Sequence, residues 1–260
     1  MMQSIRALIL DMDGVLWRDQ EEIGNLRQLF REFRRANIKV ALATNNAMRS
    51  SLQHLEKIRS FQVEDLEPWQ VVSSSDAAAF YLKSKFPQGG GVYVVGETPL
   101  VEVIENAGFR FDEQSALAVV AGIDRTVTYS KLNKATHLIR NGAFFIGTNP
   151  DKTYPTPDGL APGAGAILAA IEAAAGVAPW IVGKPSPAMY EIALERLGTK
   201  PSETLVVGDR IDTDISGAQV IGCKTALVLS GVTTLNQAMA WNPQPDFILP
   251  DLTAVLNAIT

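Results

Sequence analysis

Short runs of apolar and β-branched residues alternate along the chain with longer amphipathic stretches. The amphipathic stretches at 24–35 and 187–197 have the spacing of helices. Strands that alternate with helices are typical of an α/β protein with a parallel sheet. We therefore expect an α/β fold with a Rossmann-like parallel sheet, and the apolar runs predict its strands at 7–10, 39–44, 71–73, 204–208, 225–229 and 247–249.

The middle of the chain indicates a second α/β unit. Apolar runs at 91–96, 116–122 and 143–148 resemble the strands of such a unit. Three consecutive glycines at 89–91 mark a loop near the start of this region. A chain of 260 residues is long enough for two such units. We expect an inserted α/β domain at 77–179, and a discontinuous core formed by 1–76 and 180–260.

Composition and charge narrow the possible partners. Hydrophobic residues make up 47% of the chain and charged residues 20%, which predicts a folded protein. The net charge of −5 argues against nucleic acid or an anionic membrane as the main partner. The one cysteine, Cys223, excludes an intramolecular disulfide, and its apolar context predicts a buried, inert thiol. No uncharged apolar run reaches the roughly 18 residues of a membrane span, so a soluble cytoplasmic protein is expected.

Several common chemistries are disfavoured by residue counts and motifs. The chain has only two histidines, His54 and His137, each in a helix-like stretch, and no G-x-S-x-G motif. A zinc site or a Ser-His-Asp triad is therefore disfavoured. Walker A is absent because Lys184 is followed by proline. The acidic stretch DMDG is a poor EF-hand, since apolar residues follow where oxygen ligands should stand.

Polar residues follow four apolar runs directly. In open parallel sheets, ligands bind beyond the carboxyl ends of the strands, near the point where the strand order changes. We therefore expect the four segments to converge on one crevice, although each by itself also fits a solvated surface turn. They are Asp11 and Asp13 after ALIL, Thr44, Asn45 and Asn46 after VALA, Gly183 to Pro185 after WIV, and Asp209 with Asp214 after TLVV.

These residues suit phosphoryl transfer. Four carboxylates held close together would force some of them to take up protons. One Mg²⁺ ion and the Lys184 ammonium would supply three compensating positive charges, and Mg²⁺ binds through one or two carboxylates and phosphate oxygens. Thr44 and the Asn45 amide would donate hydrogen bonds to phosphate oxygens. The sequence thus predicts a magnesium site that acts on a phosphate ester.

The acidic pair itself offers a two-step hydrolysis. A carboxylate is ionised at neutral pH and needs no base to act as a nucleophile. A second carboxyl two residues further along an extended chain points to the same side. It would protonate the leaving oxygen and then deprotonate the water that opens the acyl phosphate.

The four segments, in this order, resemble the four motifs of the haloacid dehalogenase (HAD) superfamily. These motifs are D-x-D-G, a strand ending in Ser or Thr, a Lys, and G-D-x-x-x-x-D. Dehalogenases of the superfamily lack the second Asp, so Asp13 points to the phosphatase side. Asp212 does not match the spacing of the last motif and is expected to be exposed.

The resemblance also implies roles for the individual residues. It implies Asp11 as the nucleophile, and Asp13 as the general acid and base that also binds Mg²⁺ through its backbone carbonyl. It implies that Thr44 binds phosphate and that Lys184 is a charge clamp. The implied metal site comprises Asp11, Asp13, Asp209 and Asp214, the last either as a ligand or as support for one.

Longer stretches resemble the NagD-like, 4-nitrophenylphosphatase-like branch of this superfamily. They are DGVLWRD, ATNNAMRS, AGIDRTVTYSKLNKAT, NGAFFIGTNPDKTYPTPDGLAPGAGA and VGKPSPAMYEIAL. In that branch an α/β cap lies between the second and third motifs, where composition places the inserted domain. Only about thirty residues separate Asp13 from Thr44, too few for a cap domain. Homodimers through the cap occur among relatives, so such a dimer is also an expectation.

Substrate choice in this branch lies in the cap, and the resemblance points to the loop 148–159. Its candidate substrate contacts are Asn149, Asp151 and Tyr154, which would add to Thr44, Asn45, Asn46 and Lys184. Asn149 and Asp151 fit equally well as turn-forming residues of a Pro- and Gly-rich loop. The partner is expected to be a small phosphate ester: a nucleotide, phosphoglycolate, pyridoxal phosphate or a sugar phosphate. A phosphotransferase or mutase on the same scaffold, or a non-catalytic relative, are the alternatives.

Overall fold

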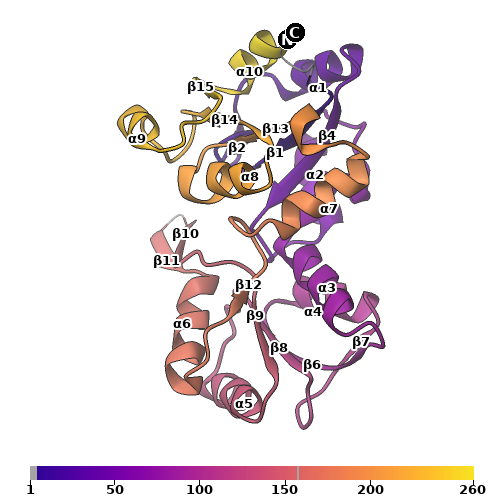
Figure 1. The fold of residues 1–260 in the computed structure, drawn as a ribbon, viewed down its shortest axis with the longest axis vertical. Coiled ribbons are helices and arrows are strands. Elements are labelled where there is room, and N and C mark those ends of the chain that lie inside the picture. The colour runs from indigo at the N-terminus through magenta and orange to yellow at the C-terminus, as the bar shows by residue number, and fades with distance from the viewer. Residues whose placement is uncertain (1–4, 157) are drawn as a thin grey trace. The chain divides into compact units, whose positions relative to one another are not determined.

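The computed structural model describes residues 5–156 and 158–260, which form two compact units (Figure 1). The core unit contains the described residues up to Thr44, with Ser51–Val72 and Lys184–Thr260. The insert unit contains Asn45–Ser50 and Ser73–Gly183. The two units therefore meet between residues 72 and 73 and between residues 183 and 184, whereas the sequence analysis placed these boundaries at 76/77 and 179/180. The assignment of the insert unit as a cap domain stays a prediction.

The core unit is built on one sheet with the strand order β15-β14-β13-β1-β4-β5. The pairs β1–β4, β1–β13, β13–β14 and β14–β15 are all parallel, which confirms the predicted fold class. The strands lie at or within one residue of the predicted ranges, because each is an apolar run bounded by polar residues. They are β1 (Ala7–Leu10), β4 (Lys39–Thr44), β5 (Val71–Ser73), β13 (Thr204–Gly208), β14 (Lys224–Val228) and β15 (Phe247–Leu249).

Helices cover both faces of this sheet. Alternate strand residues such as Leu10 and Val207 join a hydrophobic cluster with α1 (Leu26–Arg35), α2 (Ser51–Ser60) and α10 (Leu252–Ile259). Successive residues of a strand point to opposite faces, so buried residues such as Ile9 face the other side. There α7 (Ala188–Leu197) packs on β1 and β4. The remaining core elements are β2 (Trp17–Arg18), β3 (Glu21–Glu22), η1 (Pro68–Gln70), η2 (Pro201–Glu203), the π-helical turn η3 (Ile211–Ile215), α8 (Ser216–Val220) and α9 (Leu235–Ala240).

Helix α1 begins two residues later than predicted. The side chain of Asn25 accepts a hydrogen bond from the backbone N–H of Gln28 and so caps the helix. The preceding Gly24 has φ of +78°, a conformation outside the helical region. The residues at 24 and 25 therefore form the entry to the helix and its cap.

The insert unit contains a second parallel sheet, with the order β12-β9-β8-β6-β7. Helices α5 (Tyr129–Arg140) and α6 (Ala164–Ala175) contact each other and pack on this sheet over a hydrophobic cluster that includes Val119 and Phe145. The strands are β6 (Gly90–Val95), β7 (Phe109–Phe111), β8 (Ala118–Ala121), β9 (Phe144–Gly147) and β12 (Trp180–Ile181). The helices are α3 (Ser74–Lys85), α4 (Thr98–Asn106), α5 (Tyr129–Arg140) and α6 (Ala164–Ala175), and β10 (Thr153–Thr156) pairs antiparallel with β11 (Gly159–Pro162).

One prediction about the sheet is wrong. The run WIV before Lys184 was expected to end at the same sheet edge as the other three polar segments. Its residues Trp180 and Ile181 instead pair with β9 in the insert sheet. A two-residue strand carries too little pattern to specify its neighbour, so the sequence showed the strand but not its sheet.

Two further predictions concern single features. Cys223 is buried as expected, and its burial raises the pKa of the thiol to about 12, so the thiol stays protonated at neutral pH. None of the helices formed by the described residues has both the length and the apolar character that crossing a bilayer demands.

Candidate active site

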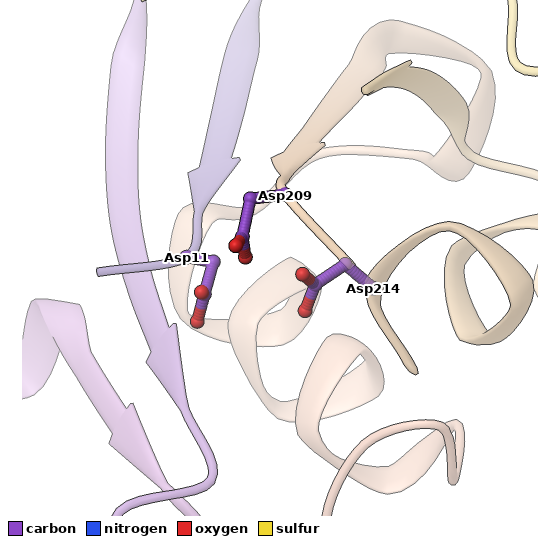
Figure 2. Close-up of side chains that lie close together, drawn as sticks. All are labelled: Asp11, Asp209 and Asp214. Atoms are coloured by element: carbon purple, nitrogen blue, oxygen red, sulfur yellow. The ribbon is translucent and has the colours of Figure 1, made fainter. Parts of the chain in front are cut away.

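Three carboxylates converge at the carboxyl edge of the core sheet (Figure 2). Asp11 directly follows β1, Asp209 directly follows β13, and Asp214 lies in the turn η3. One oxygen of each carboxylate lies within 4.8 Å of the others. Strands β1 and β13 are neighbours at the point where the strand order reverses, which is where open α/β sheets bind ligands.

Lys184 is the cation of this group. Its Nζ lies 2.5 Å from Asp11 Oδ1 and 2.7 Å from Asp214 Oδ1, and it donates a third contact of 3.0 Å to the carbonyl oxygen of Ala43. The side chains of Lys184 and Asp214 are 4% and 1% exposed, and that of Asp11 is 12% exposed. The structure thus brings Lys184 to the predicted acids although its preceding strand belongs to the other sheet.

The charges in this group do not balance, since three carboxylates surround one ammonium. Burial raises the pKa of Asp11 well above its ordinary value against the opposing effect of Lys184, and the charges of Asp214 and Asp209 add to the rise. Burial and the charge of Asp214 likewise raise the pKa of Asp209 to about 6. Burial would lower the pKa of Lys184, but Asp11 and Asp214 raise it well above its ordinary value. Lys184 therefore stays an ammonium at neutral pH.

The donor set fits a divalent metal ion. Asp209 Oδ2 accepts a 2.7 Å hydrogen bond from the backbone N–H of Val232, whereas its buried Oδ1 has no hydrogen-bond partner among the described residues. A buried polar atom without a partner is costly and rare. Carboxylate oxygens are the ligands that hard cations such as Mg²⁺ prefer. A cation here would satisfy Asp209 Oδ1 and offset the excess negative charge.

The turn η3 fixes Asp214. Its Oδ2 accepts a 3.0 Å hydrogen bond from the backbone N–H of Arg210, and the backbone N–H groups of Asp214 and Ile215 donate to the carbonyl of Arg210. The buried hydroxyl of Tyr190 donates to the carbonyl of Asp214 at 3.0 Å. Single π-helical turns are frequent at functional sites. The side chain of Asp212 in the same turn is 64% exposed, as expected.

The structure does not bring the carboxylate of Asp13 into the three-carboxylate group. The side chain of Asp13 is exposed, and its Oδ1 accepts a 2.8 Å hydrogen bond from Trp17 Nε1. The expectation that Asp11 and Asp13 point to the same side assumed an extended chain. That geometry is absent, because β1 ends at Leu10 and the carbonyl of Met12 accepts hydrogen bonds from the next turn. The catalytic and metal-binding roles of Asp13 stay predictions.

The second polar segment is divided between the two units. Thr44 is buried at the end of β4 in the core unit. Asn45 and Asn46 belong to the insert unit, where Asn46 Oδ1 accepts a hydrogen bond from the backbone N–H of Met48. The predicted phosphate contacts of these three residues stay predictions.

The candidate contacts of the loop 148–159 bond mainly to one another and to Asn45. Asn149 Nδ2 donates to the carbonyl of Asn45 at 2.8 Å, and Asn45 Nδ2 donates to Asp151 Oδ2 at 3.2 Å. Asn149 Oδ1 accepts from the backbone N–H of Asp151, which is the turn-forming role considered above. Tyr154 lies in β10, opposite Ala161. Substrate contacts by these residues stay predictions.

Comparisons with known proteins agree over the whole chain. A family model described as haloacid dehalogenase-like hydrolase matches residues 8–110, and a second, described as HAD-hydrolase-like, matches 181–255. An acid sugar phosphatase of Staphylococcus aureus (strain USA300) is 36% identical over 256 residues, which are 98% of each chain. The chain belongs to the haloacid dehalogenase-like hydrolase family.

Solved structures place this HAD-like hydrolase within the family. A 4-nitrophenylphosphatase from Thermotoga maritima has a TM-score of 0.93 at 32% identity, and the match covers 100% of this chain and 99% of that one. NagD from E. coli K-12 has a TM-score of 0.89 at 31% identity, with 96% and 97% covered. These likenesses confirm the predicted NagD-like, 4-nitrophenylphosphatase-like branch and the predicted enzyme class, a phosphatase-type hydrolase.

The sequence reasoning missed one segment of this HAD-like hydrolase, the loop 229–233 after β14. The backbone N–H groups of Val232 and Thr233 donate to the side chain and the carbonyl of Asp209. A Cβ atom added at Gly231 would overlap the Asp209 carboxylate. The signal was present, because SGVT (230–233) follows the predicted strand 225–229 as the other polar segments follow theirs. It went unused because the loop acts through its backbone.

Proposed function

We propose that this protein is a Mg²⁺-dependent phosphatase that hydrolyses small phosphomonoesters through an aspartyl-phosphate on Asp11. The observation that carries the proposal is the group of three carboxylates around the buried Lys184 ammonium at the point where the strand order reverses. Relatives named acid sugar phosphatase and 4-nitrophenylphosphatase support a phosphomonoester as the substrate.

The first step transfers the phosphoryl group to the enzyme. A carboxylate oxygen of Asp11 forms a bond to phosphorus while the bond from phosphorus to the ester oxygen breaks. Asp13 gives its proton to the departing oxygen, and the substrate leaves as an alcohol. The Lys184 ammonium remains charged and neutralises the phosphoryl oxygens, to which Thr44 donates a hydrogen bond.

The second step releases phosphate. Asp13, now a carboxylate, takes a proton from a water molecule as the water oxygen bonds to phosphorus. The bond between phosphorus and the Asp11 oxygen breaks, which restores the carboxylate and frees inorganic phosphate. Asp13 thereby returns to its starting protonation state.

Asp11, Asp209 and Asp214 are the residues that would hold Mg²⁺. When bound, the ion supplies the positive charge that keeps these carboxylates ionised and offsets the charge of the phosphate. Without it, burial holds the pKa of Asp11 well above its ordinary value, and a protonated Asp11 is a poor nucleophile. This gives a physical reason for metal dependence.

The predictions about binding partners come from the chain's net charge and from the family resemblance. We expect a small-molecule phosphate ester as the substrate, no nucleic acid or membrane partner, and a homodimer formed through the insert unit. Chromatography coupled to light scattering would test the dimer directly.

The test compares two Asp→Asn variants in hydrolysis of 4-nitrophenyl phosphate and a sugar phosphate panel. Asp11→Asn is expected to lower turnover by about 10³-fold or more, since it removes the nucleophile. Asp212→Asn changes an exposed acid next to the site and serves as the matched control with unchanged activity. Removing metal with EDTA should abolish turnover, and Mg²⁺ should restore it. Turnover that survives Asp11→Asn, or a phosphoryl group passed mainly to added alcohols, would contradict the proposal.

A further inference from the structure

A buried indole holds the predicted general acid. Trp17 Nε1 donates a 2.8 Å hydrogen bond to Asp13 Oδ1. Trp17 is 1% exposed, whereas Asp13 is exposed. The bond therefore joins a side chain with no room to move to a carboxylate that would otherwise turn freely in solvent.

Several contacts fix the indole itself. The ring of Phe61 stacks on it with centroids 5.9 Å apart, and Lys57 Nζ lies 4.2 Å from the ring centroid. Lys57 Nζ also donates to the carbonyl of Asp19, which anchors the cation that covers the ring. The backbone of Trp17 is held as well, because its carbonyl accepts a 2.8 Å hydrogen bond from the N–H of Gly14. Both the ring and the backbone of Trp17 are thus held in place.

The chemistry of the donor selects one carboxylate oxygen. An indole N–H only donates, and the carbonyl oxygen of a carboxylic acid is a much better acceptor than its hydroxyl oxygen. The bond to Oδ1 therefore favours the form of protonated Asp13 that carries its proton on Oδ2. The hydrogen bond thus fixes both the direction of the carboxyl group and the oxygen from which the proton leaves.

We infer that Trp17 is a positioning residue for Asp13, which aims the proton on Oδ2 at the leaving oxygen of the substrate. The inference rests on the proposed function, in which Asp13 is the general acid. It assigns Trp17 a role beyond packing, although packing alone would explain its burial.

The test uses two substrates of similar shape that differ in their need for a proton. Phenolate is a poor leaving group and gains from protonation, whereas 4-nitrophenolate departs well without it. Loss of a general acid therefore lowers kcat/KM for phenyl phosphate much more than for 4-nitrophenyl phosphate. We expect Trp17→Phe to lower kcat/KM about 10-fold for phenyl phosphate and less than about 2-fold for 4-nitrophenyl phosphate.

Trp241→Phe is the matched control. The indole of Trp241 also donates to a side chain, Gln219 Oε1 at 3.2 Å, so the same chemical group is removed elsewhere in the core unit. This variant should leave kcat/KM unchanged for both substrates. Equal losses on the two substrates after Trp17→Phe, or no loss on either, would overturn the inference.

A second variant separates the hydrogen bond from the packing. Replacing Trp17 by 3-benzothienylalanine keeps a bicyclic ring of the same shape and removes the N–H, so it should give the same difference between substrates even if Trp17→Phe unfolds. A benzothienyl variant with wild-type kinetics on phenyl phosphate would overturn the inference.

Asp13→Asn distinguishes failure of the inference from failure of the proposed function. We expect it to show a larger loss than Trp17→Phe, again mainly on phenyl phosphate, and Trp17→Phe should add less than about 2-fold in its background. If Asp13→Asn affects both substrates equally, Asp13 is not the acid and the proposed function is wrong on this point. If Asp13→Asn discriminates and Trp17→Phe does not, the inference alone is wrong.

Discussion

Each of the two parallel sheets carries acidic residues at its own carboxyl edge, but the negative charges are neutralised differently at the two edges. At the carboxyl edge of the insert sheet, Glu97 follows β6 and Asp124 follows β8. Each has its own cation, Arg125 at 2.9 Å from Glu97 and Lys131 at 2.7 Å from Asp124. At the edge of the core sheet, three carboxylates share the single ammonium of Lys184.

This difference in balance distinguishes a structural edge from a reactive one. The hydrogen bond from Arg125 lowers the pKa of Glu97, so that edge is satisfied as it stands. The pKa of Asp209 is instead raised to about 6 by burial and by Asp214. Similar folds therefore produce opposite electrostatics, and the unbalanced edge is the one suited to bind a cation and a phosphate.

The largest expected effect comes from removing the shared cation. Lys184→Met leaves buried carboxylates without compensation, so we expect kcat/KM to fall by about 10³-fold and the free energy of unfolding to fall by about 3–5 kcal/mol. Lys131→Met removes a partly exposed cation of the insert edge and leaves the buried Asp124 carboxylate with its two hydrogen bonds from Thr126, so it should cost less, about 1–3 kcal/mol. Urea unfolding in EDTA measures both losses, and similar losses would contradict the comparison.

The next effect is a difference in sign between two Asp→Asn changes. Asp209→Asn removes one negative charge from the unbalanced edge, so the metal-free protein should gain about 1–3 kcal/mol at neutral pH. Asp124→Asn weakens a satisfied carboxylate that accepts from Lys131 and from both donors of Thr126, and should cost about 1–3 kcal/mol. Added Mg²⁺ should stabilise the wild type and the Asp124 variant but not the Asp209 variant. If both substitutions changed the unfolding free energy of the metal-free protein in the same direction, the contrast between the two edges would be refuted.

The two edges should also respond to pH in opposite directions. The folded pKa of Glu97 lies below its ordinary 4.5, so its contribution to stability is complete above that value and is lost as the pH falls. The folded pKa of Asp209, about 6, lies above its ordinary 3.8, so its contribution is complete below 3.8 and is lost as the pH rises to 6.

Difference curves isolate these contributions in the metal-free protein. The unfolding free energy of the wild type minus that of Asp209→Asn should fall between pH 4 and 6, by at most about 1.4 kcal/mol per pH unit. The corresponding difference for Glu97→Gln should rise with pH below 4.5. Two curves of the same slope would contradict the assigned pKa directions.

The smallest effect is expected at the turn that carries Asp214. Tyr190→Phe removes a buried hydroxyl that donates to the carbonyls of Thr213 and Asp214, and keeps the ring. We expect a loss of about 1 kcal/mol in unfolding free energy and a weaker Mg²⁺ affinity. Calorimetric titration with Mg²⁺ would show the second effect, and an unchanged affinity would mean that the turn holds Asp214 without this hydroxyl.

Much of the fold was predictable because a strand that is buried on both faces of its sheet has a sequence without charged residues. Ala7–Leu10 and Thr204–Gly208 are runs without a charged residue, each followed at once by an aspartate. The same rule located Asp11 and Asp209, whereas Asp214 came from its spacing in the motif that the chain resembles. It depends only on parallel strands ending at one edge, so it survives errors of a residue or two.

The remainder depends on local geometry that residue types do not reveal. Asp13 turns to Trp17 because the chain leaves the strand at Leu10, and the period of two no longer holds there. The loop 229–233 binds Asp209 through backbone N–H groups, which every residue except proline possesses. The short strand Trp180–Ile181 joins the other sheet, since strand pairing is decided by the whole fold.

The space around Asp209 also limits how this enzyme can evolve. Gly14 and Gly231 both approach its carboxylate so closely that even a methyl group would displace it. At Gly14 the backbone, with φ of +84°, adds a second obstacle, whereas at Gly231 the obstacle is the contact itself. Gly222 has a similar φ of +77°, but none of the described residues lies within 4 Å of a Cβ atom added there, so a substitution costs backbone strain alone. Random variation should therefore be tolerated better at Gly222 than at Gly14 and Gly231, two positions with no reactive group of their own.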